Sequence, residues 1–344
     1  MAEPGWKLVL IFAGALALQA QERVCDRSAS ERLEAEGLAA MRGRDYPLAE
    51  RRLTEAFDAC PDKPDVLPEL AQAQLSRRNF DAAIRTSTQY LALNPASTAG
   101  RLMLANAYLM ALRLKEALAE ANLILRSHPS DSDALKIRGN AAYLLGDVEM
   151  AKESFIRLLD RHPNDDDVAY MLGRIYYQEG YIDLAMGQFE RILKRNPGSY
   201  KALDNLGLCH EAQGDYEGAT RYFLSAIKLV EKDHPEYEWP YTNLADLLVK
   251  TGDPQRGFDA ASKAVNRNPM SARSFYIGAK ALNQLGKTDL ALNWLERSAS
   301  LNPTSSETWY LLGIVYRKLQ QNDKAEEAVQ RFRDLKAREP GRRR

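Results

Sequence analysis

The stretch YMLGRIYYQEGYIDLAMGQFERILKRNP, from Tyr170 to Pro197, decides the fold of this chain. Its pattern of two small residues and a closing proline recurs about every 34 residues, with one spacing of 38 between Gly207 and Ala245. Small residues let two helices approach closely, apolar residues between them follow helical spacing, and the proline ends the second helix. The first small position holds Gly37, Ala71, Ala105, Gly139, Gly173, Gly207, Ala245, Ala279 and Gly313, and the second holds Ala49, Ala83, Ala117, Ala151, Ala185, Ala219, Gly257, Ala291 and Ala325.

This pattern resembles the tetratricopeptide repeat, a pair of antiparallel helices. The resemblance rests on Leu172, Gly173, Tyr176, Gly180, Ala185, Phe189 and Pro197 and on their counterparts in the other units. It implies an all-α fold, a right-handed superhelical solenoid of about nine helix-turn-helix repeats over residues 30–339. Such repeats stack into one elongated unit with a continuous core, so length alone does not require two domains.

The spacing of 38 predicts a longer helix rather than a hinge. Four extra residues are close to the 3.6 residues of one helical turn, so the apolar face is nearly preserved. The segment after Ala219 holds no glycine, and its proline, Pro235, comes late. We expect the second helix of the sixth repeat to run to about Lys232.

The N-terminus departs from the repeat and has the pattern of a secretory signal. Lys7 precedes the apolar run LVLIFAGALAL (8–18), which is too short to span a bilayer, since that needs about 20 residues. Small residues follow at 17–20. We expect a signal peptide over 1–20, a short leader over 21–29 and a periplasmic or extracellular protein with no stable membrane insertion after cleavage. The alternative is an uncleaved apolar helix that packs on the first repeat.

Two of the three cysteines support export. Ser28 and Glu31 form a capping-box pattern, which places the start of the first helix near Ser28, just after Cys25. Cys60 ends the second helix of the same hairpin, so antiparallel geometry brings the two cysteines together. A disulfide would close a loop of about 35 residues and stabilise the terminal repeat by about 3–4 kcal/mol. The alternative is two unrelated thiols in a reducing compartment.

The pair Cys209 and His210 is the strongest candidate for a metal or catalytic site, and the repeat argues against it. Consecutive helical residues point about 100° apart, so their side chains cannot share a ligand. His210 occupies the position that holds Tyr176 in the preceding repeat, and Cys209 is expected to be a buried thiol. The acidic run 165–167 stands at a helix start, where carboxylates act as caps. We therefore expect no enzyme activity, no catalytic residue, no metal and no cofactor.

Charge disfavours nucleic acid as a partner. The sequence carries 47 basic and 47 acidic residues, interspersed along the chain, and its net charge is zero. The basic tail at 340–344 is short. A nucleic-acid binder usually concentrates basic residues on one face, because phosphate contacts supply most of its affinity.

The resemblance implies that the first helix of each repeat lines a concave groove. In the middle layers this face combines tyrosines, amides and basic residues, which can bind an extended backbone and provide contact area. An alternative is that the tyrosines only pack and the polar groups are solvated. The expected partner-binding residues are Asn140, Tyr143, Tyr170, Arg174, Tyr177, Asn205, Asn243, Tyr276 and Lys280.

The sequence thus predicts a scaffold that binds a protein or extended peptide, and export would suit a role in cell-envelope assembly. The alternative is an intracellular adaptor of the co-chaperone kind, without export. Some relatives grip a C-terminal carboxylate with lysines and asparagines at these positions. Lys136 and Asn140 match that pattern here, but Met171 stands where an asparagine is needed, so chaperone-tail recognition is not supported.

Overall fold

The computed structural model describes residues 25–338, and the regular structure within them is entirely helical. Eighteen α-helices and one short 3-10 helix cover this range, which confirms the all-α fold and agrees with nine helix pairs. The expected signal peptide (1–20) and basic tail (340–344) lie outside the described residues, as do residues 21–24 of the expected leader.

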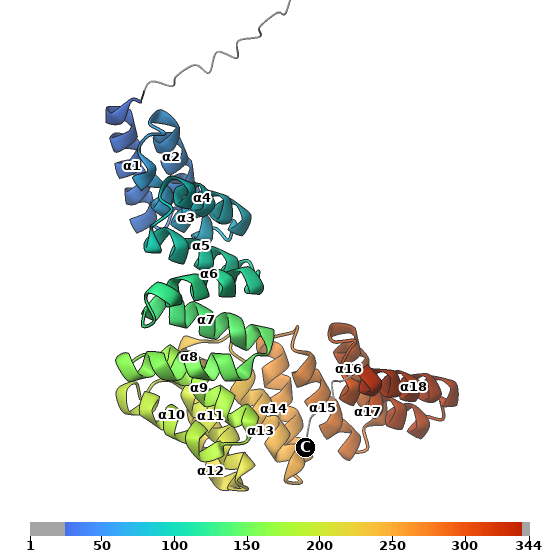
Figure 1. The fold of residues 1–344 in the computed structure, drawn as a ribbon. Helices are drawn as coiled ribbons and strands as arrows, with labels where there is room; N and C mark the ends of the chain where they lie inside the picture. Colours follow the sequence, from blue (N-terminus) through green and yellow to red (C-terminus); the bar gives the residue numbers. More distant parts are fainter. Residues whose placement is uncertain (1–24, 339–344) are drawn as a thin grey trace, which may run out of the picture. The chain divides into compact units, whose positions relative to one another are not determined.

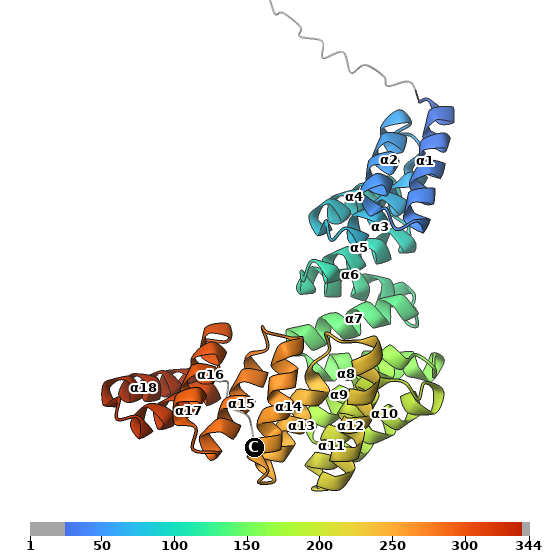
Figure 2. The ribbon, with the colours of Figure 1, turned by 180° about the vertical axis from the view of Figure 1, so that it is seen from behind.

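The helices fall into two compact units, divided between Asp147 and Val148, inside the fourth repeat. In each unit, consecutive helices lie side by side in chain order (Figures 1 and 2). The first unit comprises α1 (Arg27–Arg42), α2 (Tyr46–Ala59), η1 (Pro64–Val66), α3 (Leu67–Ser76), α4 (Phe80–Leu93), α5 (Thr98–Met110), α6 (Leu114–Ser127) and α7 (Ser132–Leu145). The second unit comprises α8 (Val148–Arg161), α9 (Asp166–Glu179), α10 (Ile182–Arg195), α11 (Tyr200–Ala212), α12 (Tyr216–Asp233), α13 (Trp239–Lys250), α14 (Pro254–Arg267), α15 (Ala272–Gln284), α16 (Thr288–Leu301), α17 (Ser306–Lys318) and α18 (Asn322–Arg338).

The small residues of the repeat are required by close helix packing. A Cβ atom built on Gly173 would lie 2.8 Å from the ring of Phe189, and one built on Gly207 would lie 2.5 Å from the ring of Phe223. Both phenylalanines are fully buried. The alanines at the second small position are likewise buried. The first helix of a repeat therefore packs on its second helix through an aromatic or aliphatic side chain that only a small residue admits.

The sixth repeat confirms the expected extra turn. Its second helix, α12, continues to Asp233, one residue beyond the expected end at Lys232. Val230, in the added turn, and Ile227, just before it, are buried in one cluster with Tyr241 and Leu244 of α13. The four additional residues therefore lengthen an amphipathic helix, because its apolar face continues to find a partner.

Helix α1 begins at Arg27, which agrees with the expected start near Ser28, but the residue that caps it differs from the expectation. The capping residue is Asp26, whose Oδ1 accepts a hydrogen bond from the backbone N–H of Ala29 at 2.9 Å. Ser28 lies inside the first turn, so the expected capping box at Ser28 and Glu31 is wrong. Aspartate at the N-cap satisfies an open backbone donor and also interacts favourably with the helix dipole. The same role falls to Asp165 at the start of α9, as expected, where its Oδ1 accepts from Val168 at 3.0 Å.

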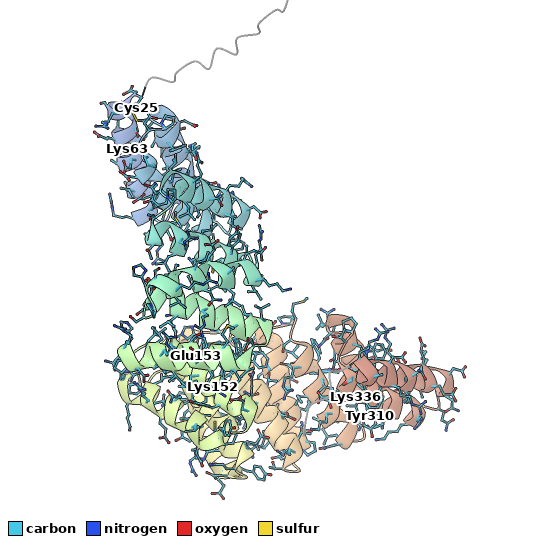
Figure 3. All side chains as sticks on the ribbon, in the orientation of Figure 1. Cys25, Lys63, Lys152, Glu153, Tyr310 and Lys336 are labelled. Atoms are coloured by element: carbon cyan, nitrogen blue, oxygen red, sulfur yellow. A yellow bond between two sulfur atoms is a disulfide. The ribbon has the colours of Figure 1, made fainter. Side chains whose placement is uncertain are left out.

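The ends of the first hairpin come together as the antiparallel geometry requires. The backbone N–H of Asp26 donates to the carbonyl of Ala59 at 2.8 Å. The structure joins Cys25 to Cys60 by a disulfide, with their Cα atoms 4.2 Å apart, well below the roughly 7 Å beyond which a bridge needs backbone movement. Figure 3 labels Cys25 at this end of the first unit, together with Lys63, whose ammonium lies 2.6 Å from Glu34.

Candidate functional site

The first helices of the second unit enclose a hollow of about 660 Å³, which we call the aromatic groove. Helices α9, α11, α13 and α15, each the first helix of its repeat, contribute to it. Its volume falls in the usual range of ligand sites, about 300–1,000 Å³. The aromatic groove is lined by Tyr170, Arg174, Tyr177, Gln178, Asp204, Asn205, Leu208, Tyr237, Trp239, Asn243 and Arg273.

A smaller hollow of about 190 Å³ continues the aromatic groove along α11 and α13. It shares Tyr177, Leu208, Asn243 and Arg273 with the groove and adds charged groups. The ammonium of Lys250 lies 3.1 Å from Glu211, and the guanidinium of Arg273 lies 3.0 Å from Asp246. Opposite charges are thus paired along this edge. A charged partner must either fit between these ion pairs or replace one member of a pair.

The aromatic groove brings together five of the nine expected binding residues: Tyr170, Arg174, Tyr177, Asn205 and Asn243. Tyr276 and Lys280 lie farther along α15. Tyr276 lines a separate hollow of about 210 Å³ formed by α15, α16 and α17, and the ammonium of Lys280 lies 3.3 Å from Asp246. Asn140 and Tyr143 lie on α7 and belong to the first unit, so they are described apart from the aromatic groove.

The two asparagines of the aromatic groove are engaged within the protein. Nδ2 of Asn205 donates to Oη of Tyr170 at 3.2 Å and to the carbonyl of Lys201 at 2.9 Å. Nδ2 of Asn243 donates to Oδ1 of Asp204 at 2.9 Å. Both asparagines are buried. Their amide N–H groups therefore hold neighbouring side chains in place, whereas the sequence suggested that they bind a partner's backbone.

Asp204 is a buried carboxyl group in the wall of the aromatic groove. Only 3% of the residue is exposed. Burial raises its pKa to about 7, although the hydrogen bond from Asn243 opposes this effect. The carboxyl group therefore changes its protonation near neutral pH, while ordinary aspartates are fully ionised there.

Three half-buried tyrosines, Tyr177, Tyr237 and Tyr276, stay neutral and can act as hydrogen-bonding groups. Burial raises the pKa of Tyr177 and, more strongly, that of Tyr237. Burial also raises the pKa of Tyr276 to about 12. Tyr170 contributes its ring as well as its hydroxyl group, since the guanidinium of Arg174 lies 5.9 Å from the ring centre. Such side chains combine a large contact area with a polar tip.

Sequence reasoning missed two aromatic residues of the aromatic groove, Tyr237 and Trp239. They lie at the start of α13, directly after the lengthened helix α12. The ring of Tyr237 lies 4.8 Å from that of Tyr200, and Trp239 remains 42% exposed. The spacing of 38 residues could have indicated these two residues. An insertion between two repeats changes which side chains the connecting loop places beside the groove.

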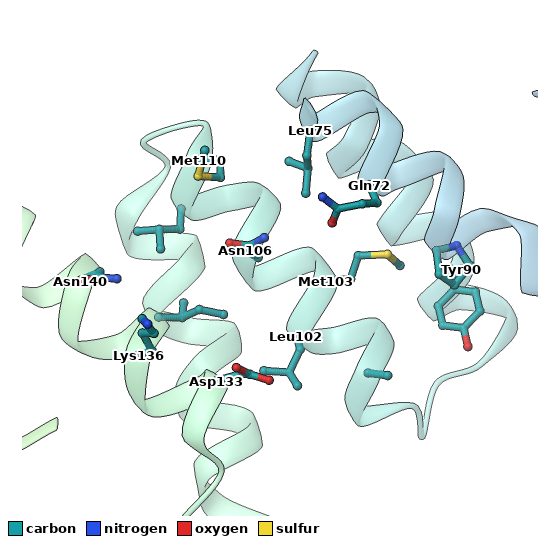
Figure 4. Close-up of a pocket in the computed structure, with 14 residues that line it drawn as sticks. Gln72, Leu75, Tyr90, Leu102, Met103, Asn106, Met110, Asp133, Lys136 and Asn140 are labelled. Carbon is teal, nitrogen blue, oxygen red and sulfur yellow. The ribbon is translucent and has the colours of Figure 1, made fainter. Parts of the chain in front are cut away.

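The first unit contains its own hollow, of about 580 Å³, which we call the apolar groove. Helices α3, α5 and α7 supply most of its wall, as Figure 4 shows. Of the residues that line it, the sequence placed only Asn140 among the expected partner-binding residues. The apolar groove is lined by Pro68, Gln72, Leu75, Tyr90, Ala99, Leu102, Met103, Asn106, Leu109, Met110, Asp133, Lys136, Ile137 and Asn140.

Cys209 and His210 have separate surroundings in α11. Cys209 is fully buried, as expected, and burial raises the pKa of its thiol to about 12, which disfavours the reactive thiolate. Nδ1 of His210 lies 2.8 Å from Asp215, and its ring stacks on Tyr222 with centres 4.8 Å apart. Across residues 25–338, no group of three or more potential ligands among His, Cys, Asp and Glu could hold a metal.

No helix in the described part of the chain is long and apolar enough to cross a membrane.

Comparison with known families identifies the repeat. Two sequence models described as tetratricopeptide repeat match residues 34–98, 138–189 and 170–234 and residues 75–141. Together these matches extend over residues 34–234, more than half of the chain. A further model, described as anaphase-promoting complex, cyclosome, subunit 3, matches residues 259–332.

The similar curated proteins are much longer than the matched segments. Protein CTR9 homolog of Arabidopsis thaliana is 25% identical over 109 residues, which cover 32% of this chain and 10% of that protein. Protein unc-45 homolog B of Homo sapiens is 30% identical over 107 residues, which cover 31% of this chain and 11% of that protein. This chain therefore spans about a tenth of the length of these relatives.

Solved structures share the fold at low sequence identity. A tetratricopeptide repeat protein from Parabacteroides merdae has a TM-score of 0.63 at 20% identity, over 74% of this chain and 99% of that one. The APC/C hetero-tetramer Cut9–Hcn1 gives a TM-score of 0.60 at 17% identity, over 78% of this chain and 52% of that one. The family matches and the helix pairs agree, and the chain belongs to the tetratricopeptide repeat family.

Proposed function

We propose that this protein is a non-enzymatic scaffold that binds a peptide or protein partner in the aromatic groove. The supporting observation is the convergence of Tyr170, Tyr177, Tyr237 and Trp239 with Arg174 in one hollow on the first helices. Residues that dominate binding energies in interfaces are most often tyrosine, tryptophan and arginine. Proteins of this repeat family bind proteins or peptides, and the evenly balanced charge of this chain favours such a partner over nucleic acid.

Replacing Arg174 and Tyr177 together by alanine should weaken partner binding with little change in helicity or thermal midpoint. Truncation of such residues typically costs about 2 kcal/mol or more of binding free energy. The matched control is Glu190→Ala with Lys194→Ala on α10, two exposed residues of a second helix. Binding is compared by affinity capture from the native host with quantitative mass spectrometry. If the groove variant retained every partner and the control variant lost them, the partner would bind to the face formed by the second helices instead.

Site-specific crosslinking identifies the partner directly. A photoreactive phenylalanine analogue in place of Tyr177 should form a crosslink to the partner in the native host, and the same analogue in place of Lys194 should not. Crosslinks of equal yield from both positions would show that contact is not confined to the aromatic groove.

We further propose that the protein is exported and acts in or beyond the cell envelope, where it could contribute to envelope assembly. Support comes from the apolar run over 8–18 and from the juxtaposition of Cys25 and Cys60 at the end of the first hairpin. Intact mass of protein from the native host should show loss of about 20 residues and two hydrogens fewer than the reduced form. A full-length N-terminus with free thiols would instead support the intracellular adaptor.

A further inference from the structure

Hydrogen-bond acceptors without a donor gather in the wall of the aromatic groove. Nδ2 of Asn205 donates to the carbonyl of Lys201, and Nδ2 of Asn243 donates to Oδ1 of Asp204, each at 2.9 Å. A backbone carbonyl and an ionised carboxylate only accept hydrogen bonds, so each amide turns its NH2 group into the protein and keeps its oxygen as the remaining acceptor. Across residues 25–338, no hydrogen bond reaches Oδ1 of either asparagine or Oδ2 of Asp204. None of these three oxygens is fully enclosed, so each remains accessible from the hollow that its residue lines.

Asp204 brings to this cluster a negative charge that has no positive partner. Within the described residues, no basic side chain pairs with its carboxyl group, and only burial and one hydrogen bond act on its pKa. The arginines of the wall have other partners. The guanidinium of Arg273 lies 3.0 Å from Asp246, and that of Arg174 lies 5.9 Å from the ring centre of Tyr170. A buried carboxylate without a counter-ion is unfavourable, so a cation that entered the hollow would gain a charge partner without breaking an existing ion pair.

Aromatic side chains stand beside the acceptors. Oη of Tyr170 lies 3.2 Å from Nδ2 of Asn205. Burial and, next, the charge of Asp204 raise the pKa of Tyr237, so this tyrosine also lies near the cluster. Trp239 lines the same hollow and is 42% exposed. Aromatic rings attract organic cations through their faces and offer surface to an apolar body, so the wall suits a cation that carries apolar groups.

We propose that the aromatic groove contains a binding site for a small organic amine, whose ammonium group pairs with Asp204. A primary ammonium carries three N–H donors and no acceptor, which matches Oδ2 of Asp204 and the amide oxygens of Asn205 and Asn243. A quaternary ammonium would balance the charge but leave these acceptors without donors. The apolar body of the amine lies against Tyr237 and Trp239. This ligand site goes beyond the scaffold role, and since its test needs no partner protein, either assignment can fail alone.

Isothermal titration calorimetry with 2-phenylethylamine tests the site directly. At pH 8 we expect saturable binding to the intact protein with a Kd below about 1 mM. The analogue 2-phenylethanol lacks the charge, and 2-phenylethyltrimethylammonium keeps the charge but lacks N–H donors. Each should bind at least about 10-fold more weakly, because hydrogen bonds to a charged group are lost. Absence of amine binding, or equal binding of either analogue, would overturn the proposal.

A second titration distinguishes a free amine from a lysine side chain, since both carry a primary ammonium. The probe is Nα-acetyl-lysine N-methylamide, which presents this group on a peptide backbone. It should bind more weakly than 2-phenylethylamine, because it has no ring to place against the aromatic wall. Equal or tighter binding of the lysine derivative would assign the site to lysine side chains of a partner protein and contradict a small-amine site.

The pH dependence of binding identifies the carboxyl group. The pKa of Asp204 is about 7, so about a tenth of these groups are ionised at pH 6 and about nine-tenths at pH 8, while an alkylamine stays protonated throughout. Binding should therefore be about 10-fold tighter at pH 8 than at pH 6. Binding that did not tighten with pH would contradict the proposal. The other titratable or charged side chains around the cluster are Tyr170, Arg174, His234, Tyr237, Glu238 and Arg273.

Matched substitutions separate Asp204 from these neighbours. Asp204→Asn keeps the size of the side chain and removes its charge, so it should weaken amine binding about 10-fold or more at pH 8 and abolish the pH dependence. Asp259→Asn, at an exposed position of α14, should change neither. Circular dichroism checks that each variant is folded. If Asp204→Asn bound the amine as tightly as the parent at pH 8, or kept the pH dependence, Asp204 would only link α11 to α13 and the proposal would be wrong.

Discussion

Asparagines on the first helices have different roles in the two units. Asn140 lines the apolar groove with its side-chain amide unengaged in the described residues, whereas Asn205 and Asn243 are buried and donate to neighbouring groups. A buried amide that lost its partner would cost about 1–3 kcal/mol, so Asn205 and Asn243 are tied to structure even though they line a groove. At the residue scale, function therefore depends on which hydrogen bonds are already made.

Asp204 gives the second unit a pH-dependent stability. Its pKa is about 7 in the folded protein and about 3.9 in an unfolded chain, so the folded state binds the extra proton between these values. The free energy of unfolding should then fall as pH rises from about 4 to about 7 and level off above it. Asp204→Asn retains the acceptor for Asn243 and removes the titration. It should raise the thermal midpoint at pH 8 and change it little at pH 4.

Circular dichroism melts across this pH range measure the difference between Asp204→Asn and the parent protein. Asp259→Asn, at an exposed position of α14, is the control and should show no such pH-dependent gain. A constant difference between the Asp204 variant and the parent from pH 4 to pH 8 would show that the carboxyl group titrates normally.

At the element scale, the turn inside each hairpin requires a left-handed backbone. In the fourth to eighth repeats glycine supplies it, as in Gly180 with φ of 83°. In the remaining repeats the same conformation falls on Arg44, Arg78, Leu112 and Gln320, at φ between 57° and 61°. A side chain with a Cβ is disfavoured there by about 1–2 kcal/mol. In these four turns the residue present is therefore unfavourable for the backbone conformation that the turn requires.

Leu112→Gly should stabilise the first unit. Leu112 has φ of 57° and is 70% exposed, so glycine relieves strain and removes little packing. The relief of about 1–2 kcal/mol exceeds the entropic cost of glycine in the unfolded chain, about 0.4–1 kcal/mol. We expect a net gain of about 0.5–1 kcal/mol, measured by urea unfolding.

The neighbouring residue provides the control for this prediction. Ala111 has φ of −77°, a conformation in which glycine gains nothing, so Ala111→Gly should destabilise the same turn. Equal destabilisation by both substitutions would mean that the left-handed turn carries no strain.

At the scale of the whole molecule, stability is distributed along the chain. Each repeat packs mainly on its neighbours in sequence, so a change at one end affects nearby repeats most. The disulfide between Cys25 and Cys60 closes the first hairpin, and among the described residues α1 packs mainly on α2. Such a covalent constraint opposes separation of the two helices of this hairpin.

Reduction of this disulfide should loosen the first repeat selectively. Loss of a bridge that closes a loop of 35 residues removes up to about 3–4 kcal/mol in the loop-entropy account. Hydrogen exchange with mass spectrometry should then show faster exchange in α1 and α2 after reduction and unchanged exchange in α17 and α18. Cys25→Ser with Cys60→Ser should reproduce the effect without a reductant. Uniform acceleration along the chain would contradict nearest-neighbour stabilisation.

The sequence by itself determined the helices and their pairing. The signals for a helix pair lie within one repeat: apolar periodicity, a closing proline and small residues such as Gly173 and Gly207. One repeat is therefore enough to predict a helix pair, and the recurrence of the same signals supports the prediction for the other repeats. The same local reasoning located the end of α12. It placed the start of α1 within one residue but chose the wrong cap, because Ser28 and Asp26 are both acceptable caps and the backbone path decides between them.

Only the tertiary structure decided which groove residues are open to a partner. Burial of Asp204, the hydrogen bond from Asn243 and the arrival of Tyr237 and Trp239 beside Tyr170 each depend on residues from different repeats. An amide side chain that is hydrogen-bonded within the protein can occupy the same position of the repeat as one that is not. The repeat pattern therefore could not distinguish the two. Hydrogen-bond partners and solvent exposure are set by the neighbouring layers, and they become defined only once the helices are packed.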